Sequence, residues 1–116
     1  MLVGKMKKIV ICAAMLLAAG CAKRPEEIAA TPVAVDPYMQ MQCSQLTPLK
    51  AQKEVELSQL EKEQKDTADQ DAAAMAVIHV PVGSMTGSDK EPQVARAKGE
   101  VQAINSAYQS KGCAAG

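Results

Sequence analysis

The chain has 116 residues, carries 13 Lys and Arg against 13 Asp and Glu side chains, and is 47% apolar. Its length allows one small domain at most, and two tyrosines are its only aromatic residues, so large core-filling side chains are scarce. The balanced charge argues against a nucleic-acid partner, which would require a basic surface.

Residues 1–20 are predicted to be a secretory signal peptide. Lys5, Lys7 and Lys8 form a basic head, and residues 9–19 form an apolar run of about 11 residues. A membrane-spanning helix needs roughly 20 apolar residues, so this run is too short to remain as a span.

The apolar run ends in Leu17-Ala18-Ala19-Gly20-Cys21, which resembles a bacterial lipobox. The commonest lipobox has Leu three places before the cysteine, whereas Leu17 lies one place earlier. The resemblance implies cleavage before Cys21, acylation of its thiol and of the new amino terminus, and a stable lipid anchor, because several acyl chains hold a protein at a membrane. The alternative is an ordinary signal peptide that leaves Cys21 as a plain thiol.

Ala22 follows the cysteine. In enterobacterial lipoproteins an Asp at this position favours retention in the inner membrane, so by analogy Ala22 favours the outer membrane, facing the periplasm. The mature chain would keep 10 basic against 13 acidic side chains, because the three signal-peptide lysines are removed.

Cys43 and Cys113 are the remaining cysteines after Cys12 leaves with the signal peptide and Cys21 is acylated. They permit one intramolecular disulfide, in a compartment where disulfides persist. Closing this long loop would stabilise the fold by about 4 kcal/mol in the chain-entropy description. Free thiols or intermolecular bridges are the alternatives. With His79, the two cysteines fall one ligand short of a zinc site and lack ligand spacing, so we predict no metal and no cofactor.

Residues 21–42 contain Pro25, Pro32 and Pro37 and show no sustained periodicity. They are predicted to form a flexible, lipid-anchored tether between the membrane and the folded domain. The alternative, left open for residues 33–41, is that the segment packs on the domain.

A first long helix is predicted over residues 48–76, with Thr47 as the N-cap and Pro48 at the first helical position. Its apolar stripe is interrupted by Lys53 and Gln64. The charged run 54–71 is predicted to be a solvated helix face. The stripe consists of Leu46, Leu49, Leu57, Leu60, Ala68, Ala72 and Met75.

Residues 77–88 are predicted to form an apolar loop, because Pro81, Gly83 and Gly87 prevent a continuous helix. Residues 72–85 carry no formal charge, and His79 is their only titratable side chain. The segment is too short to span a bilayer.

A second helix is predicted over residues 89–111. The sequence Ser88-Asp89-Lys90-Glu91 has capping-box spacing, and Gly112 is a natural C-cap. Gly99 lies off the apolar stripe and is expected to weaken the helix by up to ~1 kcal/mol. The stripe consists of Val94, Ala97, Val101, Ile104, Tyr108 and Lys111.

Together these elements predict an all-α fold, an antiparallel two-helix hairpin over residues 43–113 followed by a short tail, 114–116. The disulfide would close the base of the hairpin beside the tether, and the apolar loop would lie away from the lipid. The chain is similar to small bacterial lipoproteins. This resemblance supports the predicted fold and implies no particular activity. The matching residues are Cys43, Gly83, Gly87, Ala97-Lys98-Gly99-Glu100 and Lys111-Gly112-Cys113.

The sequence favours a non-enzymatic structural or protein-interaction module of the cell envelope. Membrane lipid, through acylated Cys21, and another envelope protein are the expected partners. Exposed apolar patches often mark interaction sites, and methionine adapts to varied partners. The alternative is that the apolar segment, residues 75–85, packs on the chain's own helices. The candidate interaction residues are Met75, Val77, Ile78, Val80, Val82 and Met85.

An oligomeric, coiled-coil-like envelope component of a secretion, conjugation or phage-related system is the alternative function. An enzyme is not expected. His79 is the only histidine and has no Cys or Asp nearby in sequence to form a nucleophile–base pair. No catalytic residue and no small-molecule substrate are therefore predicted.

Overall fold

The structure, a computed structural model, describes residues 21–115. All regular structure within this range is helical, which confirms the all-α prediction. The predicted signal peptide, residues 1–20, lies outside the described residues. The elements are η1 (Pro25–Glu27), α2 (Asp36–Met39), α3 (Cys43–Val77), α4 (Val82–Met85), α5 (Glu91–Ser110) and η2 (Cys113–Ala115).

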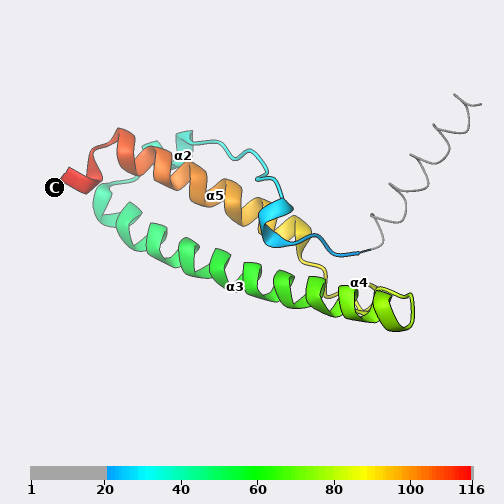
Figure 1. Ribbon diagram of the computed structural model, residues 1–116. Coiled ribbons are helices and arrows are strands. Elements are labelled where there is room, and N and C mark those ends of the chain that lie inside the picture. The colour runs from blue at the N-terminus through cyan, green and yellow to red at the C-terminus, as the bar shows by residue number, and fades with distance from the viewer. Residues whose placement is uncertain (1–20, 116) are drawn as a thin grey trace, which may run out of the picture.

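The two long helices, α3 and α5, lie side by side and run in opposite directions (Figure 1). The molecule is elongated, with dimensions of 63 × 37 × 19 Å. A small hydrophobic core lies between the start of α3 and the end of α5, where Leu46, Ile104 and Ala107 are fully buried beside Cys113.

Helix α3 begins at Cys43, five residues before the predicted start. The backbone N–H of Gln42 donates to Oε1 of Gln45 at 3.1 Å. The Gln45 side chain therefore satisfies a backbone donor just before the first helical residue. Thr47 is not the N-cap: its hydroxyl donates to the Cys43 carbonyl at 2.9 Å. Pro48 lies inside the helix, where its missing N–H removes one backbone hydrogen bond near the start.

The connection between the long helices is not a simple loop, because residues 82–85 form the short helix α4. Tight bends flank it, with positive φ angles of 60° at His79 and 79° at Gly87. Helix α5 begins two residues after the predicted start, and Asp89 accepts a hydrogen bond from the Glu91 N–H at 3.0 Å. Gly112 follows the helix with φ of 68°, as the predicted C-cap requires.

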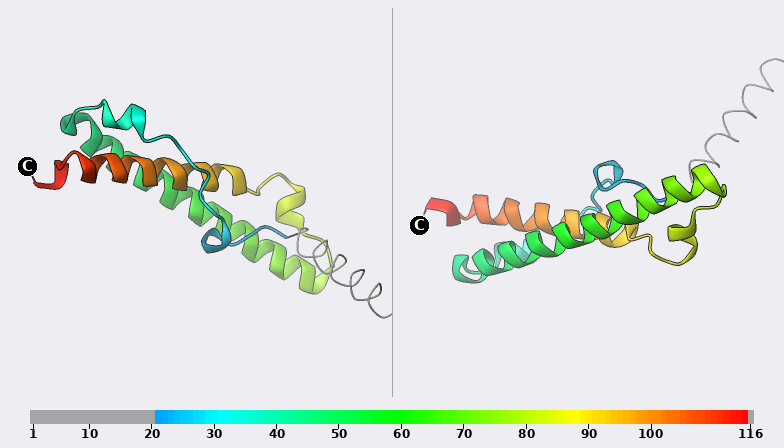
Figure 2. Two further views of the ribbon diagram at one scale, coloured as in Figure 1. Left: turned by 90° about the horizontal axis from the view of Figure 1, so that it is seen from above. Right: turned by 60° about the horizontal axis from the view of Figure 1, so that its bottom comes forward.

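Residues 22–42 do not form a free tether: the segment packs along the two long helices (Figure 2), and for residues 33–41 this is the alternative that the sequence left open. Ala22, Pro25 and Ile28 are buried. The Thr31 N–H donates to the Ala95 carbonyl at 2.9 Å, which ties the extended backbone to α5.

Further contacts hold both halves of this packed amino-terminal segment. The ammonium group of Lys98 donates to the carbonyl oxygens of Pro25 and Ile28, the latter at 2.8 Å. Near α2, Val35, Tyr38 and Met41 pack against the hydrophobic core. Two helices alone cannot enclose this small core, and the segment supplies the third side.

Gly99 makes the close approach of the segment possible. A Cβ atom at Gly99 would lie 1.8 Å from the carbonyl oxygen of Thr31 and 2.9 Å from a methyl carbon of Val33. Gly99 therefore lies on a buried face of α5, not off the packed surface as the two-helix interpretation of the sequence implied.

Candidate interaction site

Four of the six large apolar side chains that are exposed in the described range gather around the end of α3 and α4. Val77 is 78% exposed, Ile78 56%, Val82 42% and Met85 70%. Two further candidates from the sequence, Met75 and Val80, are half-buried. We call Val77, Ile78, Val82 and Met85 the apolar tip; none of the helices within residues 21–115 covers these four side chains.

The packed amino-terminal segment begins beside this tip. The backbone N–H of Ala22 donates to Oδ2 of Asp71 at 2.8 Å. The same oxygen accepts a hydrogen bond from the Ser84 hydroxyl at 2.5 Å, and Oδ1 accepts the Ser84 N–H at 3.0 Å. Ala22 and helix α4 are therefore joined through one carboxylate.

Asp71 is fully buried. Burial raises the pKa of this carboxyl group, but hydrogen bonds from the Ser84 hydroxyl and from backbone N–H groups, including that of Ala22, outweigh burial and leave the pKa below its ordinary value. The carboxylate is therefore charged at neutral pH and has donors at both oxygens. Gly83 allows the close approach of α4, since a Cβ atom there would lie 3.0 Å from Asp71 Oδ1.

About two turns earlier on α3 than Asp71, Gln64 makes a second buried junction. Its amide nitrogen donates to the Lys23 carbonyl at 2.8 Å and to Asp89 Oδ1 at 2.9 Å, and its oxygen accepts the Lys90 N–H at 2.6 Å. Gln64 thus links the amino-terminal segment, α3 and the start of α5. Ion pairs from Lys23 to Glu91 and from Arg24 to Asp69 lie on the surface around it.

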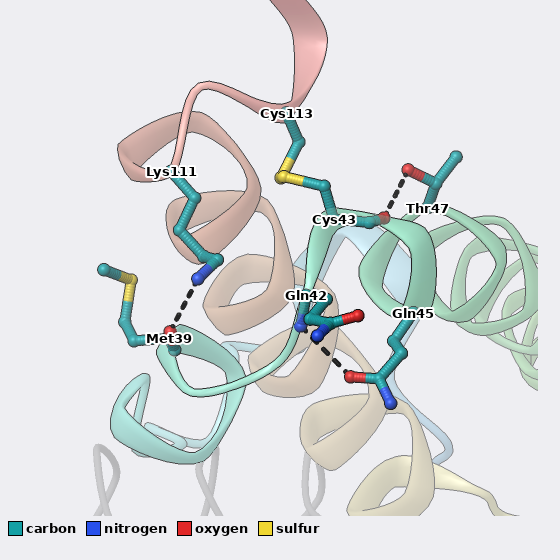
Figure 3. Close-up of a disulfide and its surroundings, with 7 residues drawn as sticks. All are labelled: Met39, Gln42, Cys43, Gln45, Thr47, Lys111 and Cys113. Carbon is teal, nitrogen blue, oxygen red and sulfur yellow. Dashed lines mark hydrogen bonds between the residues drawn. A yellow bond between two sulfur atoms is a disulfide. The ribbon is translucent and has the colours of Figure 1, made fainter. Parts of the chain in front are cut away.

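The disulfide lies at the other end of the molecule. Cys43 and Cys113 are joined with Cα atoms 5.4 Å apart, and the Lys111 ammonium donates to the Met39 carbonyl at 2.9 Å (Figure 3). The disulfide joins the start of α3 to the end of α5, next to residue 42, but it lies far from Cys21. Residues 22–42 run back along the helices, and the start of the described chain lies at the end of the molecule that carries α4 (Figure 1).

Cys21 is partly exposed and is the free cysteine of the described residues. His79 is exposed at a bend. Within residues 21–115 there is no cluster of three or more His, Cys, Asp or Glu side chains with the geometry to hold a metal ion. No described helix is both long and apolar enough to cross a membrane.

Glu100 lines a shallow groove between α3 and α5 and takes part in an ion pair that joins the two helices. Lys53 pairs with Glu100 at 2.9 Å, and Glu100 also pairs with Arg96 at 3.0 Å. The hydrogen bond from Lys53 lowers the pKa of Glu100 more than burial raises it, and the hydrogen bonds with Glu100 and Glu56 raise the pKa of Lys53. The ion pair between Lys53 and Glu100 therefore links α3 to α5.

Sequence reasoning missed the buried polar residues that attach the amino-terminal segment. Gln64 and Asp71 looked like interruptions of a stripe and members of a solvated run, yet both are fully buried. The available signal was their position, since Gln64, Ala68 and Asp71 follow one another at four and three residues, the spacing of one helix face.

The chain matches no known family, and no curated protein or solved structure is significantly similar to it.

Proposed function

We propose that this chain is a lipid-anchored, non-enzymatic protein of the bacterial cell envelope, acting as a structural or protein-interaction module. In this proposal the signal peptide is removed before Cys21, acyl chains on Cys21 hold the protein at the outer membrane, and a disulfide-closed helical hairpin extends into the periplasm. Membrane lipid and another envelope protein are its partners.

One observation carries the proposal: the residue that directly follows the lipobox-like cysteine is packed into the fold. Ala22 is buried and its N–H is held by Asp71, whereas the neighbouring Cys21 is partly exposed and unpaired among the described cysteines. Cleavage would break the bond before Cys21 and leave the Cys21–Ala22 amide intact. The contact with Asp71 is therefore compatible with both cleavage and acylation.

The arrangement of apolar residues favours this function over the oligomeric coiled-coil alternative. Val94, Ala97 and Ile104 of the α5 stripe are buried within the chain, against α3 and the amino-terminal segment. Four of the six large apolar side chains that are exposed in the described range belong to the tip, and Val55 and Met39 are the other two. A contact made through the tip, with membrane lipid or with another protein, is thus better supported than association along the helices.

The test is the intact mass of the full chain, produced in a bacterium with an outer membrane and extracted from its envelope. Cleavage before Cys21 with added acyl chains, in the outer-membrane fraction of a density gradient, is the expected result. The Cys21→Ser variant is the control, because it removes the acceptor thiol without changing a buried side chain. An uncleaved chain, or a processed chain without acyl groups, would refute the anchor.

A further inference from the structure

The apolar tip and the anchored cysteine lie at the same end of the molecule. Ala22 N and Ser84 Oγ both donate to Asp71 Oδ2, which places them within about 5 Å of each other. Ser84 lies in α4 between Val82 and Met85, two residues of the tip. Acyl chains on Cys21 would therefore hold the tip close to the lipid surface.

We infer that the apolar tip inserts into the bilayer surface that holds the Cys21 acyl chains; the inference rests on the proposed function, since it requires the anchor. Val77, Ile78, Val82 and Met85 expose apolar surface to water, and moving such surface into an apolar medium is favourable. The anchor removes most of the cost of bringing the protein to the membrane, because it raises the local concentration of lipid at the tip.

The charges support a lipid surface over a polar partner. No Asp, Glu, Lys or Arg lies between Ala72 and Ser88. The charged carboxylate of Asp71, which holds α4, is fully buried and accepts three hydrogen bonds, so insertion of the tip does not place an unpaired charge in an apolar medium. Two ion pairs lie on the surface behind it, Arg24 with Asp69 and Lys23 with Glu91. Apolar insertion without a basic patch is expected to depend little on salt or on anionic lipid.

Insertion fixes the orientation of the molecule. Helix α3 is 35 residues long, about 52 Å at 1.5 Å per residue. With the tip in the lipid surface, the disulfide end projects into the periplasm, so contacts with other envelope proteins are expected there. This is the reverse of the orientation that the sequence alone suggested.

The experiment uses the full chain with the photoreactive residue p-benzoylphenylalanine placed at Ile78, produced in the bacterium and reconstituted in phosphatidylcholine vesicles. The matched control is the same residue at Val55, which lies on the surface of α3 and has almost the same exposure, 57% against 56%. Val55 lies about 33 Å from the end of α3. Neither substitution replaces a buried side chain.

After illumination, the fraction of protein that gains the mass of one phosphatidylcholine is expected to be about tenfold higher at Ile78 than at Val55, because the benzophenone at Ile78 reaches acyl C–H bonds. Equal yields at the two positions would overturn the inference. So would cross-linking in native membranes that joins Ile78 mainly to another protein, because the tip would then bind a protein partner.

The same mass spectra separate the two proposals. Absence of acyl groups on Cys21 refutes the proposed function. Acylated protein whose Ile78 position does not label lipid refutes only the insertion. A Val77→Asp, Met85→Asp double variant gives an independent check: these side chains are exposed, so folding is preserved, and lipid labelling from Ile78 is expected to fall by about tenfold or more, since charge opposes insertion.

Discussion

Replacing Gly99 by Ala tests whether the amino-terminal segment is packed or free. In an isolated helix this substitution stabilises by about 1 kcal/mol, because Ala has the higher helix propensity. In the packed structure the new Cβ would lie 1.8 Å from the Thr31 carbonyl oxygen, about half of an ordinary contact distance. The two arrangements therefore predict opposite signs.

The expected cost follows from what must move. The Thr31 backbone has to shift by more than 1 Å, which breaks its hydrogen bond to the Ala95 carbonyl, worth about 1 kcal/mol. Overpacking adds about 1–3 kcal/mol. After the gain in helix propensity, the net loss is about 2 kcal/mol, and the Tm of a domain of this size falls by ~10 °C.

The assay is thermal and chemical unfolding of the chain from residue 21 onward, carrying Cys21→Ser so that no acyl chain is added. Gln102→Ala, at an exposed position of α5, is the control for helix propensity alone. Faster tryptic cleavage after Lys23 in the Gly99→Ala variant would locate the damage in the segment. A variant more stable than the parent would show that the segment does not pack on α5.

Two further predictions concern Asp71 and the disulfide. Because the pKa of Asp71 is lowered in the folded state, its carboxylate contributes stability that is present above about pH 4, the unfolded pKa, and is lost as the pH falls through the folded value. Asp71→Asn is expected to lower the free energy of unfolding by about 1–3 kcal/mol at neutral pH, because an amide leaves a donor unmatched. Measured by urea unfolding between about pH 2 and 5, the free energy of unfolding of this variant should depend less on pH than that of the parent. An unchanged pH dependence in this range would contradict the role of Asp71. Reduction of Cys43–Cys113, which are 70 residues apart, is expected to lower the free energy of unfolding by up to ~4 kcal/mol, measured by denaturation with and without reductant; Cys43→Ser should reproduce the loss and be insensitive to reductant.

The sequence predicted α5 well because its apolar stripe is regular and its ends carry ordinary signals, Pro92 in the first turn and Gly112 after the last. The start of α3 was misplaced because Thr47-Pro48 is a strong local start signal. Tertiary contacts override it: Leu46, before the proline, is fully buried in the core, which favours a helix that already includes it.

The packing of residues 22–42 could not be found from periodicity, because the segment has none and its contacts are mostly backbone hydrogen bonds and single buried side chains. The sequence indicates this packing only through residues of the long helices that contact the segment. Gly99 in mid-helix and the buried polar residues Gln64 and Asp71 cost stability in a two-helix hairpin, and each is explained once a third layer covers it.

The packed amino-terminal segment also determines how the protein responds to a pulling force on Cys21. Tension would reach the hydrogen bond between Ala22 and Asp71 first, and the segment would then detach from α3 and α5 one contact at a time. Fully peeled, its roughly 20 residues would extend about 60 Å. The load would then arrive at Cys43, where the disulfide passes it to the ends of both long helices at once. The segment would therefore lengthen under force as its contacts break, and the Cys43–Cys113 disulfide would limit further extension.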